Sequence, residues 1–192
     1  MKVLCRWLAV ALLLGGCASP ARDTTALLAP GLPLALPRPA DMGSSIEAVQ
    51  MITAHHDGQE FAFEAHLSIT SQRVLLAGVD PMGQRVMTVT WQDNDIKVDA
   101  SPFLPKEVRP GAMLADIVAL YWPEAVVRRA LAPAGGTLAA TPDTRAVFDS
   151  KGREVLRAEY QSGSDHPWSG GLHYRNLAWG YDIDVETLQV SQ

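Results

Sequence analysis

Hydrophobic and polar residues alternate with a period of two along most of the chain after residue 45. In the clearest run, residues 59–70, one face holds Phe61, Phe63, Ala65, Leu67 and Ile69, and the other holds Glu64, His66, Ser68 and Thr70. This period is typical of a strand with one buried face and one solvated face. Similar runs predict strands at 46–56, 73–79, 84–92, 96–98, 147–148, 155–160, 172–179 and 181–190. Turn sequences such as Asp57-Gly58 join them, so we expect an α+β fold dominated by an antiparallel meander.

Two predicted helices interrupt the alternation. Residues 112–122 are apolar on almost every side, with Asp116 as the only charge, and the run stops before Pro123. A helix of this kind is buried on most sides, and a length of about 11 residues is too short to span a bilayer. We expect it to lie against the concave face of the sheet, either as ordinary core or as one wall of a cavity. A second, shorter helix is predicted at 124–131.

The first 16 residues have the composition of an export signal. Lys2 and Arg6 precede an apolar run, residues 7–14, that is far shorter than the roughly 20 residues of a transmembrane helix. The run ends in Leu14-Gly15-Gly16-Cys17, which resembles a bacterial lipobox, where the cysteine is acylated and the leader is removed. We therefore expect residues 1–16 to be a lipoprotein signal peptide and Cys17 to be lipidated. Gly16-Cys17-Ala18 also fits an ordinary signal peptidase site, which would release a soluble protein.

The next segment is rich in proline, alanine and leucine, with prolines at positions 20, 30, 33, 37 and 39. Proline lacks the backbone donor that helices and sheet ladders use. We therefore expect residues 17–44 to form an extended tether between Cys17 and a folded domain of residues 45–192.

Charge and cysteine content narrow the function classes. The 192 residues include 16 basic and 21 acidic residues, and loss of Lys2 and Arg6 with the leader makes the mature chain more acidic still. An acidic protein repels phosphate backbones, so nucleic acid is excluded as a partner. The two cysteines are Cys5, in the leader, and Cys17, so the mature domain has none for a disulfide or a metal thiolate. The hold on a membrane would come from the acyl chains on Cys17.

Three groups of residues have the side chains of a chemical site. His55 and His56 are neighbours on a strand, so they point to opposite faces, and we expect solvated histidines rather than a metal site. The last strand carries Asp182, Asp184 and Glu186 on one face, and we expect this face to be an ordinary acidic surface exposed to solvent. The residue types of a hydrolase catalytic triad occur close together in one predicted loop, which contains Ser162, Ser164, Asp165 and His166. We expect no metal, no cofactor and no enzyme.

In the order of these features, the chain resembles a small family of proteobacterial outer-membrane lipoproteins. The genes of that family often lie in aryl-polyene, fatty-acid-synthase-like clusters. The order consists of the lipobox leader, the proline-rich tether, the meander, the apolar helix ending in Trp122-Pro123 and further hairpins. The chain is similar, more distantly, to the outer-membrane lipoprotein receptor of the Lol pathway. That receptor is an open antiparallel half-barrel closed by helices over an apolar cavity that holds acyl chains. The resemblance implies such a half-barrel here, with short helices in its concave face, and Ala18 after Cys17 implies outer-membrane sorting.

The resemblance also implies candidate site residues. The predicted inward faces supply a ligand-binding set of Phe61, Phe63, Leu67, Met87, Val89, Trp91, Leu114, Ile117 and Tyr121. In the Lol receptor, a turn like Asp80-Pro81-Met82-Gly83 carries a protruding apolar residue that acts in lipoprotein insertion, and Met82 takes that place here. Asp80, Pro81 and Gly83 satisfy the turn chemistry, so Met82 either folds back onto the sheet or projects as a membrane-insertion tip.

We therefore expect a monomeric, lipid-anchored outer-membrane protein that faces the periplasm. It would bind an acyl or polyene-type lipid and assist its transfer, working with membrane lipid and a periplasmic carrier protein. One alternative is a lipid hydrolase or acyltransferase that uses Ser164 and His166. The other is a structural lipoprotein that docks a biosynthetic complex to the membrane.

Overall fold

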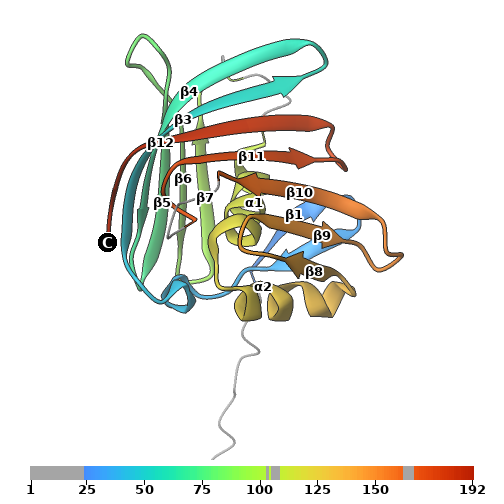
Figure 1. The fold of residues 1–192 in the computed structure, drawn as a ribbon. Helices are drawn as coiled ribbons and strands as arrows, with labels where there is room; N and C mark the ends of the chain where they lie inside the picture. Colours follow the sequence, from blue (N-terminus) through green and yellow to red (C-terminus); the bar gives the residue numbers. More distant parts are fainter. Residues whose placement is uncertain (1–23, 103, 105–108, 162–166) are drawn as a thin grey trace, which may run out of the picture.

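The computed structural model describes residues 24–102, 104, 109–161 and 167–192 (Figure 1). Within these residues, ten strands form one sheet in which neighbouring strands are antiparallel. Their order is β7-β6-β5-β4-β3-β12-β11-β10-β9-β8. Their bounds are β3 Ile46–His56, β4 Gln59–Ile69, β5 Arg73–Val79, β6 Arg85–Gln92, β7 Asp95–Ala100, β8 Thr137–Ala140, β9 Thr144–Phe148, β10 Glu154–Tyr160, β11 Gly171–Asn176 and β12 Tyr181–Ser191.

The sheet consists of two meanders, β3–β7 and β8–β12, joined where β12 pairs with β3. That ladder runs from Tyr181 opposite His56 to Ser191 opposite Glu47. The outer strands β7 and β8 do not pair with each other, so the sheet stays open while it curves around the helices (Figure 1). The predicted antiparallel, open sheet with helices on its concave side is confirmed. The hairpin turn predicted at Asp57-Gly58 is also present. The two residues have backbone φ angles of 49° and 74°, and such positive values are typical of a tight hairpin turn.

The helix α1 (Pro110–Tyr121) lies inside the curve of the sheet, and α2 (Glu124–Leu131) lies at the β8 end of that curve (Figure 1). Short 3₁₀ turns occur at Pro39–Met42 and Ala132–Ala134. The carboxyl end of α1 is fixed by Arg145 of β9, whose guanidinium donates to the carbonyls of Ala119 at 3.0 Å and Trp122 at 2.8 Å. These bonds satisfy carbonyls that a helix end leaves without an intrahelical partner. No helix in the described part of the chain is long and apolar enough to cross a bilayer.

Aromatic packing surrounds the same end of α1. The Tyr121 ring stacks on Trp168 with centroids 3.8 Å apart, and Trp122 lies 6.2 Å from Trp91 of β6. All three tryptophans are fully buried. The core therefore sits between the sheet and the carboxyl-terminal half of α1.

Residues 24–43 are not the extended tether that the prolines suggested. β1 (Thr25–Ala29) and β2 (Leu32–Ala35) form an antiparallel hairpin that packs on α1 and α2 and buries Leu28, Leu32 and Leu34. The tether prediction was wrong here because both strands of a two-stranded ladder are edges. An edge strand tolerates proline where its missing donor would face away from the ladder. Pro30 lies in the connecting turn, and the side chain of Pro33 is exposed. The signal peptide and Cys17 lie outside the described residues.

One strand of the sheet was not among those predicted. The Gly/Pro/Thr-rich stretch after α2 contains β8, a short edge strand paired with β9. Its Thr-Leu-Ala-Ala sequence contains a single large apolar residue, Leu138, so an alternating pattern could not be recognised.

We predict that Leu28→Ala lowers the free energy of unfolding by about 2–5 kcal/mol, because it leaves a cavity in a packed core. Leu27→Ala is the matched control on the same strand. Leu27 is 50% exposed and Leu28 is 0% exposed, so the control should stay within about 0.5 kcal/mol of the parent. Urea unfolding of the three proteins measures both values. Equal stability of the two variants would mean that the hairpin is not part of the folded core.

Candidate functional site

A cavity of about 140 Å³ lies between the sheet and the amino-terminal half of α1. Its walls are mainly apolar, formed by Ile52, Ala54, Phe61, Phe63, Met113, Ile183 and the rings of Tyr174 and Tyr181. They come from β3, β4, α1, β11 and β12, which the β3–β12 pairing brings side by side. Its exposed end is polar, with His56, Gln59, Glu60 and Arg109.

The structure places two of the nine predicted ligand-binding residues, Phe61 and Phe63, in the cavity wall, with ring centroids 5.6 Å apart. The other seven do not line it. Six are buried in the packed core (Leu67, Met87, Val89, Trp91, Leu114 and Tyr121), and Ile117 packs partly buried against them. The alternating pattern therefore identified the inward face correctly. It did not distinguish the part of that face filled by side chains from the part left open.

Asp116 forms the polar inner end of the cavity and is only 1% exposed. Its Oδ1 accepts a hydrogen bond from Asn176 Nδ2 at 3.1 Å, and its Oδ2 accepts one from the Tyr181 hydroxyl. Asn176 Nδ2 also donates to the carbonyl of Leu28 at 3.0 Å. The carboxyl thus joins α1 to β11, β12 and the β1–β2 hairpin. We define Asp116, Asn176 and Tyr181 as the polar junction.

Burial raises the pKa of the Asp116 carboxyl to about 7, against an opposing effect of the hydrogen bonds from Tyr181 and Asn176. Desolvation disfavours the charged form, whereas donors to the carboxylate favour it. Sequence reasoning missed the role of this residue. The signal was its position as the only charge in an otherwise apolar helix, because a charge in such a place must be partnered.

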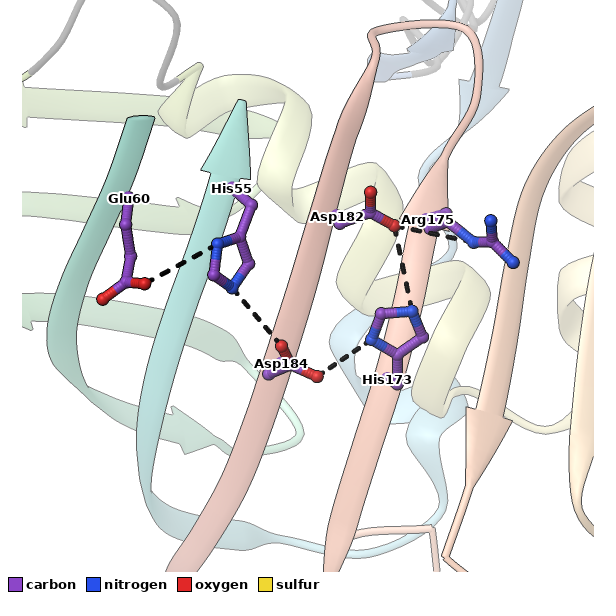
Figure 2. Close-up of polar contacts among 6 residues, drawn as sticks. All are labelled: His55, Glu60, His173, Arg175, Asp182 and Asp184. Carbon is purple, nitrogen blue, oxygen red and sulfur yellow. Dashed lines mark hydrogen bonds and ion pairs between the residues drawn. The ribbon is translucent and has the colours of Figure 1, made fainter. Parts of the chain in front are cut away.

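The outer face of the same strands carries a row of charged side chains that alternate in sign when the histidines are protonated (Figure 2). The row consists of Glu60, His55, Asp184, His173, Asp182 and Arg175, with contacts of 2.9–3.8 Å between neighbours. His55 lies in this row, whereas His56 faces the cavity, so the prediction that they point to opposite faces is confirmed. The described residues contain no group of three His, Cys, Asp or Glu side chains that could hold a metal ion.

Met82 projects from the β5–β6 turn with 85% of its surface exposed. The turn is closed by Asp80, whose Oδ1 accepts hydrogen bonds from the backbone nitrogens of Met82 and Gln84, each at 2.9 Å. The Met82 side chain therefore does not fold back onto the sheet. The hydrolase candidates Ser162, Ser164, Asp165 and His166 lie outside the described residues.

We predict that Asp116 makes stability depend on pH. Its pKa is about 7 in the folded chain and 3.8 ordinarily, so between pH 4 and 7 the folded chain keeps a proton that the unfolded chain loses. The free energy of unfolding should therefore fall as pH rises through this window, by on the order of 4 kcal/mol. Asp116→Asn cannot ionise and should flatten the fall, leaving the variant more stable than the parent at pH 8.

Thermal unfolding at pH 4 to 8 measures this slope. Asp143→Asn, at an exposed position away from the histidines, is the matched control and should keep the slope of the parent. If Asp116→Asn shows the same slope as the parent, the carboxyl is ionised in the folded chain throughout this range.

Comparison with known proteins gives a family and similar structures. No curated protein matches the chain significantly. The chain is similar to a LolA superfamily protein from Nitrosomonas europaea, with 10% identity and a TM-score of 0.46 over 80% of this chain and 90% of that chain. It is similar to a putative outer membrane lipoprotein-sorting protein domain from Vibrio parahaemolyticus, with 8% identity and a TM-score of 0.41 over 80% and 88%.

A third similar structure is a DUF1329 family protein from Desulfovibrio piger ATCC 29098, with 7% identity and a TM-score of 0.39 over 76% and 84% of the two chains. The family model described as "Protein of unknown function (DUF3261)" matches residues 47–189, which is most of the sequence. The chain belongs to the DUF3261 family.

Proposed function

We propose that this protein is an outer-membrane lipoprotein that binds a hydrocarbon chain, of the acyl or polyene type, and assists its transfer within the envelope. The observation that carries the proposal is the cavity under α1, whose walls are apolar and whose exposed end is polar. A concave apolar site with a few polar groups is the usual form of a small-molecule binding site. Binding of this kind needs no catalysis and no cofactor.

The size of the cavity indicates how much of a chain it holds. Its volume of about 140 Å³ is close to that of an engineered apolar cavity, roughly 150 Å³, that binds benzene. About six carbons would fit, and the rest of a longer chain would extend through the exposed end. At about 0.8 kcal/mol per buried CH₂, six carbons contribute about 5 kcal/mol before the costs of association. Such modest binding suits a carrier that must release what it holds.

The two halves of α1 suit different roles. The carboxyl-terminal half is held by Arg145 and by the Tyr160 hydroxyl, which donates to the Leu120 carbonyl at 2.5 Å. The amino-terminal half contributes Met113 to the cavity wall. Methionine is unbranched and adapts to irregular spaces. A longer ligand would therefore be accommodated by movement of Met113 and of the start of the helix, while the packed half stays in place.

The strand register relates the Met82 turn to the cavity opening. Val79 lies opposite Glu64, and His56 lies opposite Gln59 and Tyr181. The turns at 57–58, 80–83 and 177–180 therefore lie at the same end of the sheet. We propose that this end faces the membrane, with Met82 entering the lipid while the acyl chains on Cys17 anchor the protein. A periplasmic carrier would then deliver the ligand.

We predict that Ala54→Phe blocks binding, because its ring would occupy the cavity that Ala54 lines. The same change at Thr53 is the matched control, since the neighbouring side chain on a strand points to the opposite face. Titration with a fluorescent fatty acid should show at least tenfold weaker binding to Ala54→Phe and parent-like binding to Thr53→Phe. Melting curves verify that both variants fold. Equal binding by both variants would place the ligand outside this cavity.

We predict that Met82→Glu leaves the free energy of unfolding within about 0.5 kcal/mol, as is usual for surface substitutions. It should slow transfer of bound lipid to vesicles, because a carboxylate does not enter the apolar part of a membrane. Met82→Leu keeps an apolar tip and is the control expected to transfer like the parent. If Met82→Glu transfers normally, this residue is not the insertion tip.

A further inference from the structure

We infer that the ligand is an amphiphile with an anionic head, and that Arg109 binds the carboxylate or phosphate of that head at the cavity opening, on a turn that His56 holds in place. This assignment deepens, and rests on, the function proposed above. The geometry that supports it is the convergence of two nitrogen-bearing side chains from different elements on one turn, residues 177–180, at the exposed end of the cavity.

Arg109 precedes α1, lines the cavity and is exposed. Its guanidinium carbon lies 4.0 Å from the centroid of the Trp179 ring. Stacking on an aromatic face fixes the plane of a guanidinium without using its N–H groups as hydrogen-bond donors. Those donors suit a planar carboxylate or a phosphate, which accept two parallel hydrogen bonds from arginine.

His56 lies at the end of β3, beside the same turn. Its Nδ1 is 2.8 Å from the carbonyl oxygen of Gly180, the residue that follows Trp179. A carbonyl only accepts, so Nδ1 carries a proton and donates it to Gly180. Nε2 lies 3.5 Å from the exposed Asp57 carboxylate. The hydrogen bond to Gly180 thus fixes the turn that carries Trp179, the ring on which Arg109 stacks.

The carboxylates near the cavity contact groups other than Arg109, since Asp57 lies beside His56. Glu60 lines the opening, but its carboxylate turns to the outer face, 3.8 Å from His55 Nδ1 (Figure 2). Asp116 lies at the inner end, together with the hydroxyls of Tyr174 and Tyr181. An anionic head placed there would meet a carboxyl group and lose its hydration. The ligand therefore enters with its chain inside and its head at Arg109.

The test compares ligands that share a chain and differ in the head. A fluorescent fatty acid is first bound to the mature protein, either the parent or a variant. Its displacement is then measured with four compounds: dodecanoate, dodecyl phosphate, dodecanol and dodecylammonium. Both anions should bind at least about tenfold more tightly than dodecanol, since a charge-assisted pair of hydrogen bonds is worth about that factor or more. Dodecylammonium should bind more weakly than either anion. The order of carboxylate and phosphate separates a fatty acid from a phospholipid as the source of the head.

Arg109→Gln should remove the preference for anions, so that both anions bind this variant no more tightly than dodecanol does. Arg129→Gln, an exposed position on α2 with the same change in charge, should keep the preference. Equal binding of dodecanol and the anions to the parent, or a preference that survives Arg109→Gln, would overturn the anionic-head inference and leave the chain-binding function standing. Failure of all four amphiphiles to bind would overturn the proposed function itself.

Discussion

The hydrogen bonds of the buried Asp116 carboxyl position α1 relative to β11, β12 and the β1–β2 hairpin. Apolar packing is non-directional and would allow the helix to slide or turn within the curve of the sheet. The polar junction removes that freedom, because a buried carboxyl that loses its donors costs several kcal/mol. Asn176 extends the same constraint to the backbone of Leu28 in the β1–β2 hairpin. One side chain therefore sets the position of the helix against β11, β12 and the hairpin.

The junction also divides α1 into two functional parts. On its carboxyl-terminal side, Trp91, Trp122 and Trp168 fill the space between helix and sheet. On its amino-terminal side, Met113 of the helix faces a wall that includes Ala54 and Phe63, and a cavity remains between them. The packed half supplies stability, and the open half supplies a binding site. The junction and Arg145 hold the helix above this site without any contribution from a ligand.

The elements predicted correctly from the sequence are those set by local pattern. The alternation from Phe61 to Ile69 defined β4, Asp57-Gly58 defined its turn, and the uninterrupted apolar run before Pro123 defined α1. What was missed depends on distant contacts. The pairing of β12 with β3 joins residues more than a hundred positions apart, and it forms the cavity wall. The hairpin at 25–35 was missed because its prolines were treated as breakers, although an edge ladder tolerates them.

The candidate site shows the same limit. Periodicity placed Phe61 and Trp91 on one face, but it carries no information on which side chain meets a neighbour and which meets open space. Asp116 was visible as an isolated charge, but its donors come from residues 60 and 65 positions further along the chain. A local pattern cannot identify such donors.

Occupation of the cavity by a hydrocarbon chain is tested most directly by nuclear magnetic resonance of ¹³C-labelled methionine methyl groups during titration with dodecanoate. Met113 lines the cavity, Met51 lies on the outer face, and Met82 is at the exposed tip, so the three methyl groups report on three different surfaces. We expect a saturable shift of the Met113 signal while the signals of Met51 and Met82 stay in place. An unchanged Met113 signal at saturating ligand, or a shift confined to Met51 or Met82, would contradict chain binding in this cavity.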